Sequence, residues 1–476
     1  MIRLRTIRRF AYLIPVEVGP VADVHDPADT QRLLQIADAV VDRAGPTEQV
    51  EAVVVADRGC EIRVYGGEVE SLSSADTAGI GVRVIDGGRQ GFAWAGTLEP
   101  DAVAAVLAEA RDNLRFASVD EYAGLAEPDG VQPPQLDLYR PDVAAMPTAD
   151  KVALALEVER ATLGADPRIT GIESAEYADS VVAAAVVSTT GIRAASAESA
   201  CWLSVYSLAG DDETTQTGFG FSLGRHPGVL DPSVAAGDAA RRATRMLGAV
   251  RPTTGRTTLV LDPWVTAQLL EVIGSMLSGE AAAKGRSPFA DRLGTPVAAP
   301  MVTLVDDPTN PEAFSASAAD GEGIATRRNV LIADGVLDMF VHNATSARRA
   351  GTTTTGSAVR RGFRGVPGVG CQALALRPGT ATQAELVGAL DDAILIADVA
   401  GLHSGVNPVS GDLSVGAEGL RIRNGVIAEP LREFTIASAL QRILNDIEAV
   451  GNDLEWLPMG AAGVSLVVRD VTVSGE

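Results

Sequence analysis

The stretch from Gly401 to Gly419 constrains the fold more than any other part of this chain. It holds five glycines and one proline within nineteen residues, interspersed with Ser, Asn, Asp, Glu and His side chains. Glycine adopts positive φ values and lets other groups approach the backbone closely, so this density predicts a shaped loop. Composition alone fits a simpler interpretation equally well, in which the stretch is a series of ordinary turns between strands.

The chain is long enough for more than one hydrophobic core. A length of 476 residues exceeds the usual size of a single domain, so we expect two or three domains. Hydrophobic residues make up 46% of the chain but aromatic residues only 4%, so the cores must be built from Val, Leu, Ile and Ala. We expect an extension at 1–28, α+β domains at 29–120 and 121–250, and a larger strand-rich domain at 251–476.

Apolar periodicity and turn residues predict the secondary structure. Helices are predicted over 27–45, 100–115, 149–164, 233–247 and 263–283. Strands are predicted over 50–56, 62–65, 79–85, 90–94, 169–177, 181–189, 192–207 and 257–261. The Asp86-Gly-Gly88 sequence between two apolar runs is typical of a hairpin turn. Helices beside antiparallel hairpins, without regular strand–helix alternation, predict an α+β fold.

Charge and composition exclude several classes of partner. The formal net charge is −23 and the pI is near 4.6, which argues against nucleic acid. No window reaches the roughly 18 apolar residues needed to cross a bilayer, so we expect no membrane partner. The three cysteines, Cys60, Cys201 and Cys371, lie far apart, which fits the reducing cytoplasm and gives no metal site by spacing.

Residues 1–28 resemble a targeting segment in one respect, because four arginines precede a short apolar run there. Pro15 interrupts that run and no small-residue cleavage site follows it. We therefore expect a disordered extension or a start-codon artefact rather than a secretory signal.

Several motifs in order along the chain resemble the TldD/PmbA family (peptidase family U62). The matching segments run from about residue 30 to the end of the chain. They are Glu68, 79–85, 87–92, 306–309, 320–323, 346–351, 355–356, 403–419, 422–427 and 433–437. Each motif is weak alone, but their number and order make the resemblance specific.

The resemblance implies a zinc helix at about 263–283. Catalytic members carry His-Glu-x-x-x-His there, in which two imidazoles hold zinc and polarise a water molecule. Here the matching positions hold Leu270 and Ser275, and only Glu271 is retained. Leucine cannot bind zinc and a serine hydroxyl is a poor substitute for imidazole. The chain is therefore similar to the PmbA (TldE) branch, with no metal of its own and zinc in a partner subunit.

The four histidines leave one alternative metal site open. They are His25, His226, His342 and His403. His342 and His403 could converge with Cys371, although a lone histidine in a strand or loop is more often structural. Glu271 is either an ordinary helix carboxylate or a remnant of the motif that still faces a cavity.

A second group of polar residues could line a peptide cleft. Asp306, Asp307, Asp320 and Glu322 place four carboxylates close together, which suits Ca²⁺, Mg²⁺ or a general base but also ordinary turns. The resemblance implies that the loops at 306–323 and 347–356 line the cleft, where arginines could pair with these acids. The cleft candidates are Asp320, Glu322, Arg348, His403, Ser404, Asn407 and Ser410.

The sequence thus predicts the non-catalytic subunit of a TldD/TldE-type heterodimeric zinc metallopeptidase. The resemblance implies unfolded or extended peptides as substrates, such as peptide-antibiotic precursors and antitoxins. Two alternatives remain open, namely a peptide-binding scaffold homodimer without peptidase activity and an autonomous metallohydrolase with a non-standard site. The physiological substrate, the role of Glu271 and the need for a heterodimer are not determined by the sequence.

Overall fold

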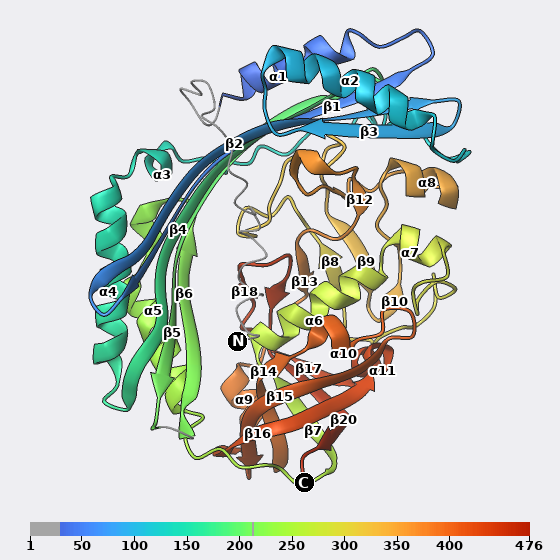
Figure 1. Ribbon diagram of the computed structural model, residues 1–476. Coiled ribbons are helices and arrows are strands. Elements are labelled where there is room, and N and C mark those ends of the chain that lie inside the picture. Colours follow the sequence, from blue (N-terminus) through green and yellow to red (C-terminus); the bar gives the residue numbers. More distant parts are fainter. Residues whose placement is uncertain (1–28, 212–213) are drawn as a thin grey trace.

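The computed structural model describes residues 29–211 and 214–476 (Figure 1). The expected extension at 1–28 lies outside the described residues. The fold is mixed α+β, as predicted, and has two main parts. A long curved sheet with helices on its outer face bends around a strand-rich C-terminal part (Figure 1).

The long sheet is antiparallel, with strand order β3-β2-β1-β4-β5-β6. Its strands are β1 (Gln49–Tyr65), β2 (Glu68–Asp86), β3 (Arg89–Ala95), β4 (Ile169–Ser188), β5 (Arg193–Ala209) and β6 (Gln216–Gly224). β1 pairs with β4 over most of its length, so 29–120 and 121–250 contribute to one continuous sheet. The hairpin predicted at Asp86-Gly-Gly88 joins β2 to β3, and both glycines have positive φ.

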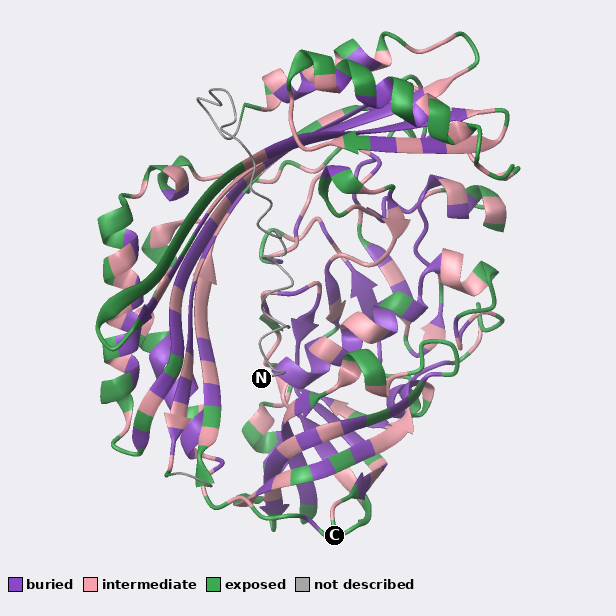
Figure 2. Cartoon of the chain, in the orientation of Figure 1, coloured by how far each residue is buried: buried purple, intermediate pink, exposed green. Residues whose placement is uncertain are grey.

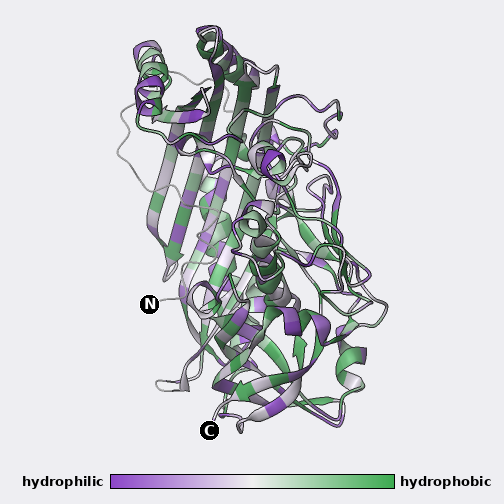
Figure 3. Cartoon of the chain, turned by 90° about the vertical axis from the view of Figure 1, so that its right-hand side faces the viewer, coloured by the Kyte–Doolittle hydropathy of each residue, from purple (hydrophilic) through white to green (hydrophobic). Residues whose placement is uncertain are grey.

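Helices cover the outer, convex face of this sheet at both ends (Figure 1). They are α1 (Thr30–Val41) and α2 (Pro100–Leu114) at one end, and α3 (Pro141–Ala145), α4 (Thr148–Ala165) and α5 (Pro232–Thr244) at the other. Alternation along β1 explains the layering, since Val50, Ala52 and Val54 pack with α1 and α2 whereas Val53 faces the C-terminal part. Figure 3 shows hydrophilic and hydrophobic residues alternating along these strands.

The Gly218-Phe-Gly-Phe221 motif shows how both faces of β6 are used. A Cβ on Gly218 or Gly220 would lie about 2 Å from main-chain atoms of α5, so only glycine lets that helix approach so closely. Phe219 and Phe221 point the other way and lie 4.7 and 5.9 Å, between ring centroids, from Trp264 of the C-terminal part. This stretch is therefore a strand at the junction of the two parts.

Several strands are longer than predicted. The predicted strands 50–56 and 62–65 are one strand, β1, and 169–177 and 181–189 are one strand, β4. Residues 68–77 of β2 were not predicted as a strand at all. They are exposed on both faces, so they lack the alternation of apolar and polar side chains that marks a half-buried strand.

The C-terminal part is built on a closed ring of five strands. Its order is β16-β15-β14-β7-β20, closed by pairing of β16 with β20 and extended by β17. The strands are β7 (Gly255–Leu261), β14 (Asp392–Ala400), β15 (Asp412–Arg423), β16 (Val426–Ala439), β17 (Ile447–Val450) and β20 (Leu466–Ser474). Among the pairs of this ring, β7 and β14 run parallel. Parallel strands need a long connection, and the chain between these two forms the remaining elements.

Those remaining elements include short sheets beside the ring. One sheet has the order β10-β9-β8-β13, and two strand pairs, β11-β12 and β18-β19, lie apart from it. The strands are β8 (Leu304–Asp306), β9 (Asn329–Ala333), β10 (Val336–Leu337), β11 (Ala358–Val359), β12 (Gly368–Val369), β13 (Leu374–Leu376), β18 (Glu455–Trp456) and β19 (Ala462–Gly463). The short helices are α8 (Ala344–Ala350), α9 (Gln383–Gly388), α10 (Leu402–Gly405), α11 (Leu440–Asn445) and the 3₁₀ turns η4 (Pro227–Val229) and η5 (Gly362–Arg364).

The predicted helix at 263–283 is two helices, α6 (Pro263–Met276) and α7 (Gly279–Ala283). The break follows from hydrogen bonding around Ser278. The Ser278 side chain caps α7 by accepting from the amide of Ala281, and the Gly279 amide donates to the carbonyl of Val341 at 2.8 Å. A continuous helix would lose both contacts. Among residues 29–211 and 214–476, the helices are too short or too polar to span a bilayer.

Candidate functional site

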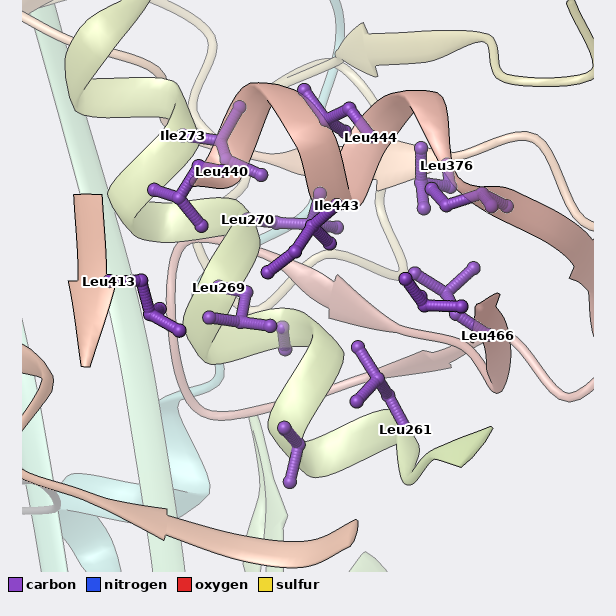
Figure 4. Close-up of a cluster of buried hydrophobic side chains, with 14 of the residues drawn as sticks. Leu261, Leu269, Leu270, Ile273, Leu376, Leu413, Leu440, Ile443, Leu444 and Leu466 are labelled. Atoms are coloured by element: carbon purple, nitrogen blue, oxygen red, sulfur yellow. The ribbon is translucent and has the colours of Figure 1, made fainter. Parts of the chain in front are cut away.

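Helix α6 is the element at which the resemblance predicts a zinc helix, and it begins at a clear sequence signal. Pro263 stands at the first turn, and the Asp262 carboxylate accepts from the Trp264 amide at 3.1 Å. Most side chains of α6 are buried against the strand ring and α11 (Figure 4). The helix therefore belongs to the main core of the C-terminal part.

The two positions that match the zinc histidines lie in different surroundings. Leu270 is 2% exposed and lies among the leucine and isoleucine side chains drawn in Figure 4. Ser275 is exposed, and its hydroxyl donates to the carbonyl of Val272 at 2.6 Å. Positions five residues apart point about 140° away from each other on a regular helix. Catalytic members have their two histidines at the same spacing, so it is the residue types, a buried leucine and a serine bonded to its own helix, that do not fit a metal ion here.

Glu271 holds a neighbouring loop. Its carboxylate accepts from the main-chain amide of Gly460 at 2.9 Å, and the loop of residues 457–461 passes beside α6 at this point. The Gly460 carbonyl in turn accepts from the Leu374 amide. The retained glutamate thus links α6 to the loop and, through that loop, to β13.

The alternative metal site of His342, His403 and Cys371 is not formed within the described residues. His342 is 7% exposed, its Nδ1 lies 3.2 Å from the hydroxyl of Ser346, and burial lowers its pKa. Cys371 lies beside α6, with its thiol donating to the Gly274 carbonyl at 3.7 Å, and burial raises its pKa. His403 is exposed on α10. Within the described ranges, no three His, Cys, Asp or Glu side chains are grouped to hold a metal ion.

The acidic loop at 320–323 is buried. Asp320 is 5% exposed and accepts from three main-chain amides, those of Glu322, Ile324 and Ala358, at 2.9–3.0 Å. Burial nevertheless raises the pKa of Asp320 to about 7. Glu322 is 1% exposed and accepts from the Ala344 amide at the start of α8. A peptide could reach neither carboxylate without displacing these contacts, which argues against the predicted cleft role.

Glu322 belongs to a buried ion network that joins the two parts of the molecule. Arg83 of β2 donates to Glu322 at 3.3 Å and to Glu51 of β1 at 2.7 Å, and Arg360 of the C-terminal part also binds Glu51. Burial alone would raise the pKa of Glu51, but Arg360 and Arg83 together lower it. This network shows that the 320–323 loop is part of the junction with the sheet.

Arg348 binds a long connecting segment of the chain. Its guanidinium donates to the carbonyls of Tyr122, Gly124 and Leu125, which follow α2. Arg349 pairs with Asp120 at 2.6 Å in the same segment. These arginines fasten the 120–125 segment to α8, so Arg348 is already engaged by main-chain carbonyls of its own chain.

The remaining cleft candidates lie together on an exposed loop. His403, Ser404, Asn407 and Ser410 are all exposed. The Asn407 side chain accepts from the amides of Val409 and Ser410, and the Ser410 hydroxyl donates to Asp412 at 2.7 Å. These bonds shape the turn locally, as the glycine density predicts. The structure brings these four residues together but separates them from buried Asp320 and Glu322.

A cavity that sequence reasoning missed lies between β6 and the C-terminal part. Its volume is about 420 Å³. It is lined by residues 221–225, Val234, 311–314, Glu455 and Trp456. The indole Nε1 of Trp456 is buried without a hydrogen-bond partner in the part of the chain that the structure describes. The alternation in Gly218-Phe-Gly-Phe221 was the available signal, because it places aromatic side chains on the face of β6 toward this cavity.

Comparison with known families covers most of the chain. Models of the PmbA/TldA metallopeptidase domain 1, central domain and C-terminal domain match residues 50–114, 141–247 and 254–475. The chain belongs to the PmbA/TldD family. The fold class and the resemblance predicted from the motifs are therefore confirmed.

Individual relatives match over nearly their whole length. The metalloprotease PmbA of Escherichia coli O157:H7 is 25% identical over 436 residues, covering 91% of this chain and 94% of that protein. A metalloprotease TldD homolog of Haemophilus influenzae is 24% identical and covers 83% of this chain and 86% of its own length. The solved structure of TldE from Thermococcus kodakarensis is 22% identical, covers 94% and 99% of the two chains, and has a TM-score of 0.83.

Membership in a metallopeptidase family raises the question of whether this chain can hold a metal on α6. The side chains at the two matching positions are a core leucine and a serine bonded to its own helix. These residues do not fit a metal ion, and Glu271 is engaged by Gly460. No catalytic step is therefore assigned to a metal on this chain.

Proposed function

We propose that this chain is the PmbA/TldE-type, non-catalytic subunit of a heterodimeric zinc metallopeptidase of the cytoplasm. In this proposal a TldD-like subunit with a His-Glu-x-x-x-His helix supplies zinc, which polarises the scissile carbonyl and the attacking water. This chain supplies part of the surface that holds an extended peptide. Family resemblance suggests peptide-antibiotic precursors and antitoxins as substrates.

The packing of Leu270 carries the proposal. An imidazole at this position would place its ring nitrogens among the aliphatic side chains of Figure 4, where they would lack partners. The core of this chain is therefore built around a leucine, and the position cannot become a ligand without repacking. Glu271, which could otherwise act as a base, already accepts a main-chain hydrogen bond from Gly460.

The concave side of the long sheet supports the peptide-holding role. Strand β6 is the outer strand of that sheet next to the cavity, and Phe221 lines the cavity wall. An extended peptide can add to a strand edge through main-chain hydrogen bonds, which tolerate many sequences, and the part of β6 that lines the cavity, 221–224, lies beyond the Phe219 carbonyl that Arg242 binds. The aromatic walls and the free indole N–H of Trp456 then provide contacts for individual side chains.

The test is a peptidase assay on this chain alone and together with a histidine-bearing TldD-like subunit. We expect hydrolysis of an unstructured peptide only by the pair. Glu271→Gln keeps an oxygen that accepts from Gly460, so the pair should retain its activity within about twofold. Replacing the glutamate of the partner's zinc motif should abolish it. Hydrolysis by this chain alone, or its loss in the Glu271→Gln pair with an unchanged melting temperature, would contradict the proposal.

A further inference from the structure

The first half of β2 is an exposed strand with a free edge. Residues 68–77 pair with β1 on one side, whereas β3 covers β2 only from Ile80 to Asp86. Residues 68–76 are exposed without interruption. Figure 2 shows this half of β2 as a continuous exposed ribbon at the rim of the sheet. Among the described residues, nothing pairs with its outer edge.

The other outer strands of the sheet are partly blocked by side chains. On β3 the carbonyl of Phe92 accepts from the Asn113 side chain of α2 at 2.9 Å. On β6 the carbonyl of Phe219 accepts from Arg242 of α5 at 2.9 Å. Proteins commonly protect sheet edges in such ways, since a free edge is a template for another strand. Within the described ranges, no helix side chain bonds to the main chain of residues 68–77, and Glu159 of α4 binds the Gly67 amide in the turn before them.

Charge does not protect this edge either. Residues 68–77 contain no lysine, arginine or proline, and their charged side chains, which also discourage edge pairing, are the carboxylates Glu68, Glu70 and Asp76. Two of its carboxylates are paired from β1, Asp76 with Arg58 at 2.8 Å and Glu70 with Arg63 at 2.7 Å. Leu72 and Val69 are 49% and 43% exposed beside these pairs. The edge therefore combines exposed apolar side chains with carboxylates of which two of three are paired to arginines of β1.

The sequence of this half-strand is symmetric in residue type about Leu72 at three of four paired positions, the exception being Glu70 and Ser74. Reading outward from Leu72 in the two directions gives Ser and Ser, then Glu and Ser, then Val and Ala, then Glu and Asp. In an antiparallel pair about a twofold axis, residues equidistant from the centre face each other on the same side of the sheet. Apolar residues then face apolar residues and serine faces serine.

We propose that the free edge of β2 is a self-association surface, on which a second copy of this chain pairs antiparallel with Leu72 opposite the second copy's Leu72. The long sheets of the two copies then continue into each other. In the centre of this pairing, each main-chain N–H and C=O group that points away from β1 forms a hydrogen bond with the second copy. The inference concerns the association of this chain with itself and does not depend on the proposed peptidase partner.

A second copy fits this edge better than a lone peptide. A lone peptide that paired with β2 would cover one side of Leu72, and its own outer edge would remain unpaired. In a second copy, the other edge of the pairing strand is already paired with that copy's β1. The symmetry about Leu72 is also a property that only pairing with the same sequence uses. At the ends Glu68 faces the second copy's Asp76, where the Arg58 that binds that aspartate offsets the repulsion.

The first experiment is sedimentation equilibrium of the full chain alone, at concentrations up to roughly 100 µM because a short interface is weak. We expect a reversible dimer that tightens with added salt, since each copy carries a net charge of −23. Leu72→Lys places two ammonium groups opposite each other and should weaken the dimer by about tenfold or more. Val426→Lys, at an apolar strand residue that is 64% exposed on β16, is the matched control and should change nothing.

The second experiment tests the register by cross-linking. Directly opposite residues lie about 5 Å apart, within disulfide range, so Leu72→Cys should give a covalent dimer on mild oxidation. Ser74→Cys lies on the same face, but its two copies would be about 14 Å apart and should not cross-link. A monomer throughout the concentration range, a dimer unaffected by Leu72→Lys, or equal cross-linking of both cysteine variants would overturn the inference.

Discussion

The two polar, glycine-containing loops of the C-terminal part, 320–323 and 401–412, have opposite environments. The first holds Asp320 and Glu322, both almost fully buried, whereas the second holds His403 and Asn407, both exposed. Their sequences alone look similar, because both combine glycine with acids and turn-forming residues. The difference is the presence of arginines from another part of the chain.

Arg83 explains why the 320–323 loop is buried. It comes from β2, more than two hundred residues earlier, and binds Glu322 inside the junction between sheet and C-terminal part. The 401–412 loop is held by its own polar groups, such as the Asn407 side chain and the Ser410 hydroxyl, and by uncharged donors of 440–441 that bind the carbonyls of Ser410 and Gly411. A polar loop is thus available for binding a peptide only where no distant charge has engaged it.

The largest expected effect comes from Arg83→Met. The substitution removes a cation and leaves Glu322 buried without an ionic partner, which typically costs about 3–5 kcal/mol. Arg423→Met is the matched control, because Arg423 and Glu429 form an exposed pair worth about 0–1 kcal/mol. Urea denaturation of both variants measures the difference. If both variants lose the same small amount of unfolding free energy, the ion network at the junction contributes little to stability.

A second prediction concerns the pH dependence that Asp320 confers. Burial raises its pKa to about 7 from 3.8. Because the folded value lies above the unfolded one, the stabilisation is complete below pH 3.8 and is lost as the pH rises to about 7. The stability of the wild type relative to Asp320→Asn should therefore decrease between these values.

Asp166 provides the control for that measurement, since Arg168 lowers its pKa to about 2. A lowered pKa gives a contribution that is lost only on acidification, so the Asp166→Asn difference should be flat from about pH 5 to 8. Chemical denaturation across this range measures both curves. A flat Asp320→Asn difference would mean that this carboxyl titrates at its ordinary value.

The smallest expected effect is on the exposed loop. Asn407→Ala removes an acceptor for two amides that water can also reach, so the loss should be about 1 kcal/mol or less. His403→Ala should leave the unfolding midpoint unchanged. If the 401–412 loop contacts peptide, both variants should lose more free energy of peptide binding than free energy of unfolding. If Asn407→Ala instead lowers the free energy of unfolding by several kcal/mol, the 401–412 loop is needed mainly for stability.

The sequence predicted much of the fold where one face of an element is buried. The boundaries of α2, the start of α5 and the hairpin at Asp86-Gly-Gly88 follow from periodicity and turn residues, whereas α5 ends at Thr244, three residues before the predicted end. The exposed half of β2 could not be predicted as a strand, because neither of its faces is buried and its sequence therefore lacks apolar alternation. The end of α6 was missed because the break depends on Val341, which is distant in sequence.

The candidate site could be predicted only in part for the same reason. The replacement of zinc ligands by Leu270 and Ser275 can be read directly from the motif. The burial of Glu322 could not, because its partner Arg83 comes from another part of the chain, and that of Asp320 could not, because one of its amide donors is the distant Ala358. The cavity at β6 was missed because its lining comes from four separate places in the chain, 221–225, Val234, 311–314 and 455–456, that only the tertiary fold brings together.

The most direct test of the proposed role is metal analysis by plasma mass spectrometry. The full chain is purified alone and then in complex with a histidine-bearing TldD-like subunit, and zinc is counted per protein. We expect none on the lone chain and about one zinc per pair, because Leu270 and Ser275 offer no ligand set. Stoichiometric zinc on the lone chain would contradict the account.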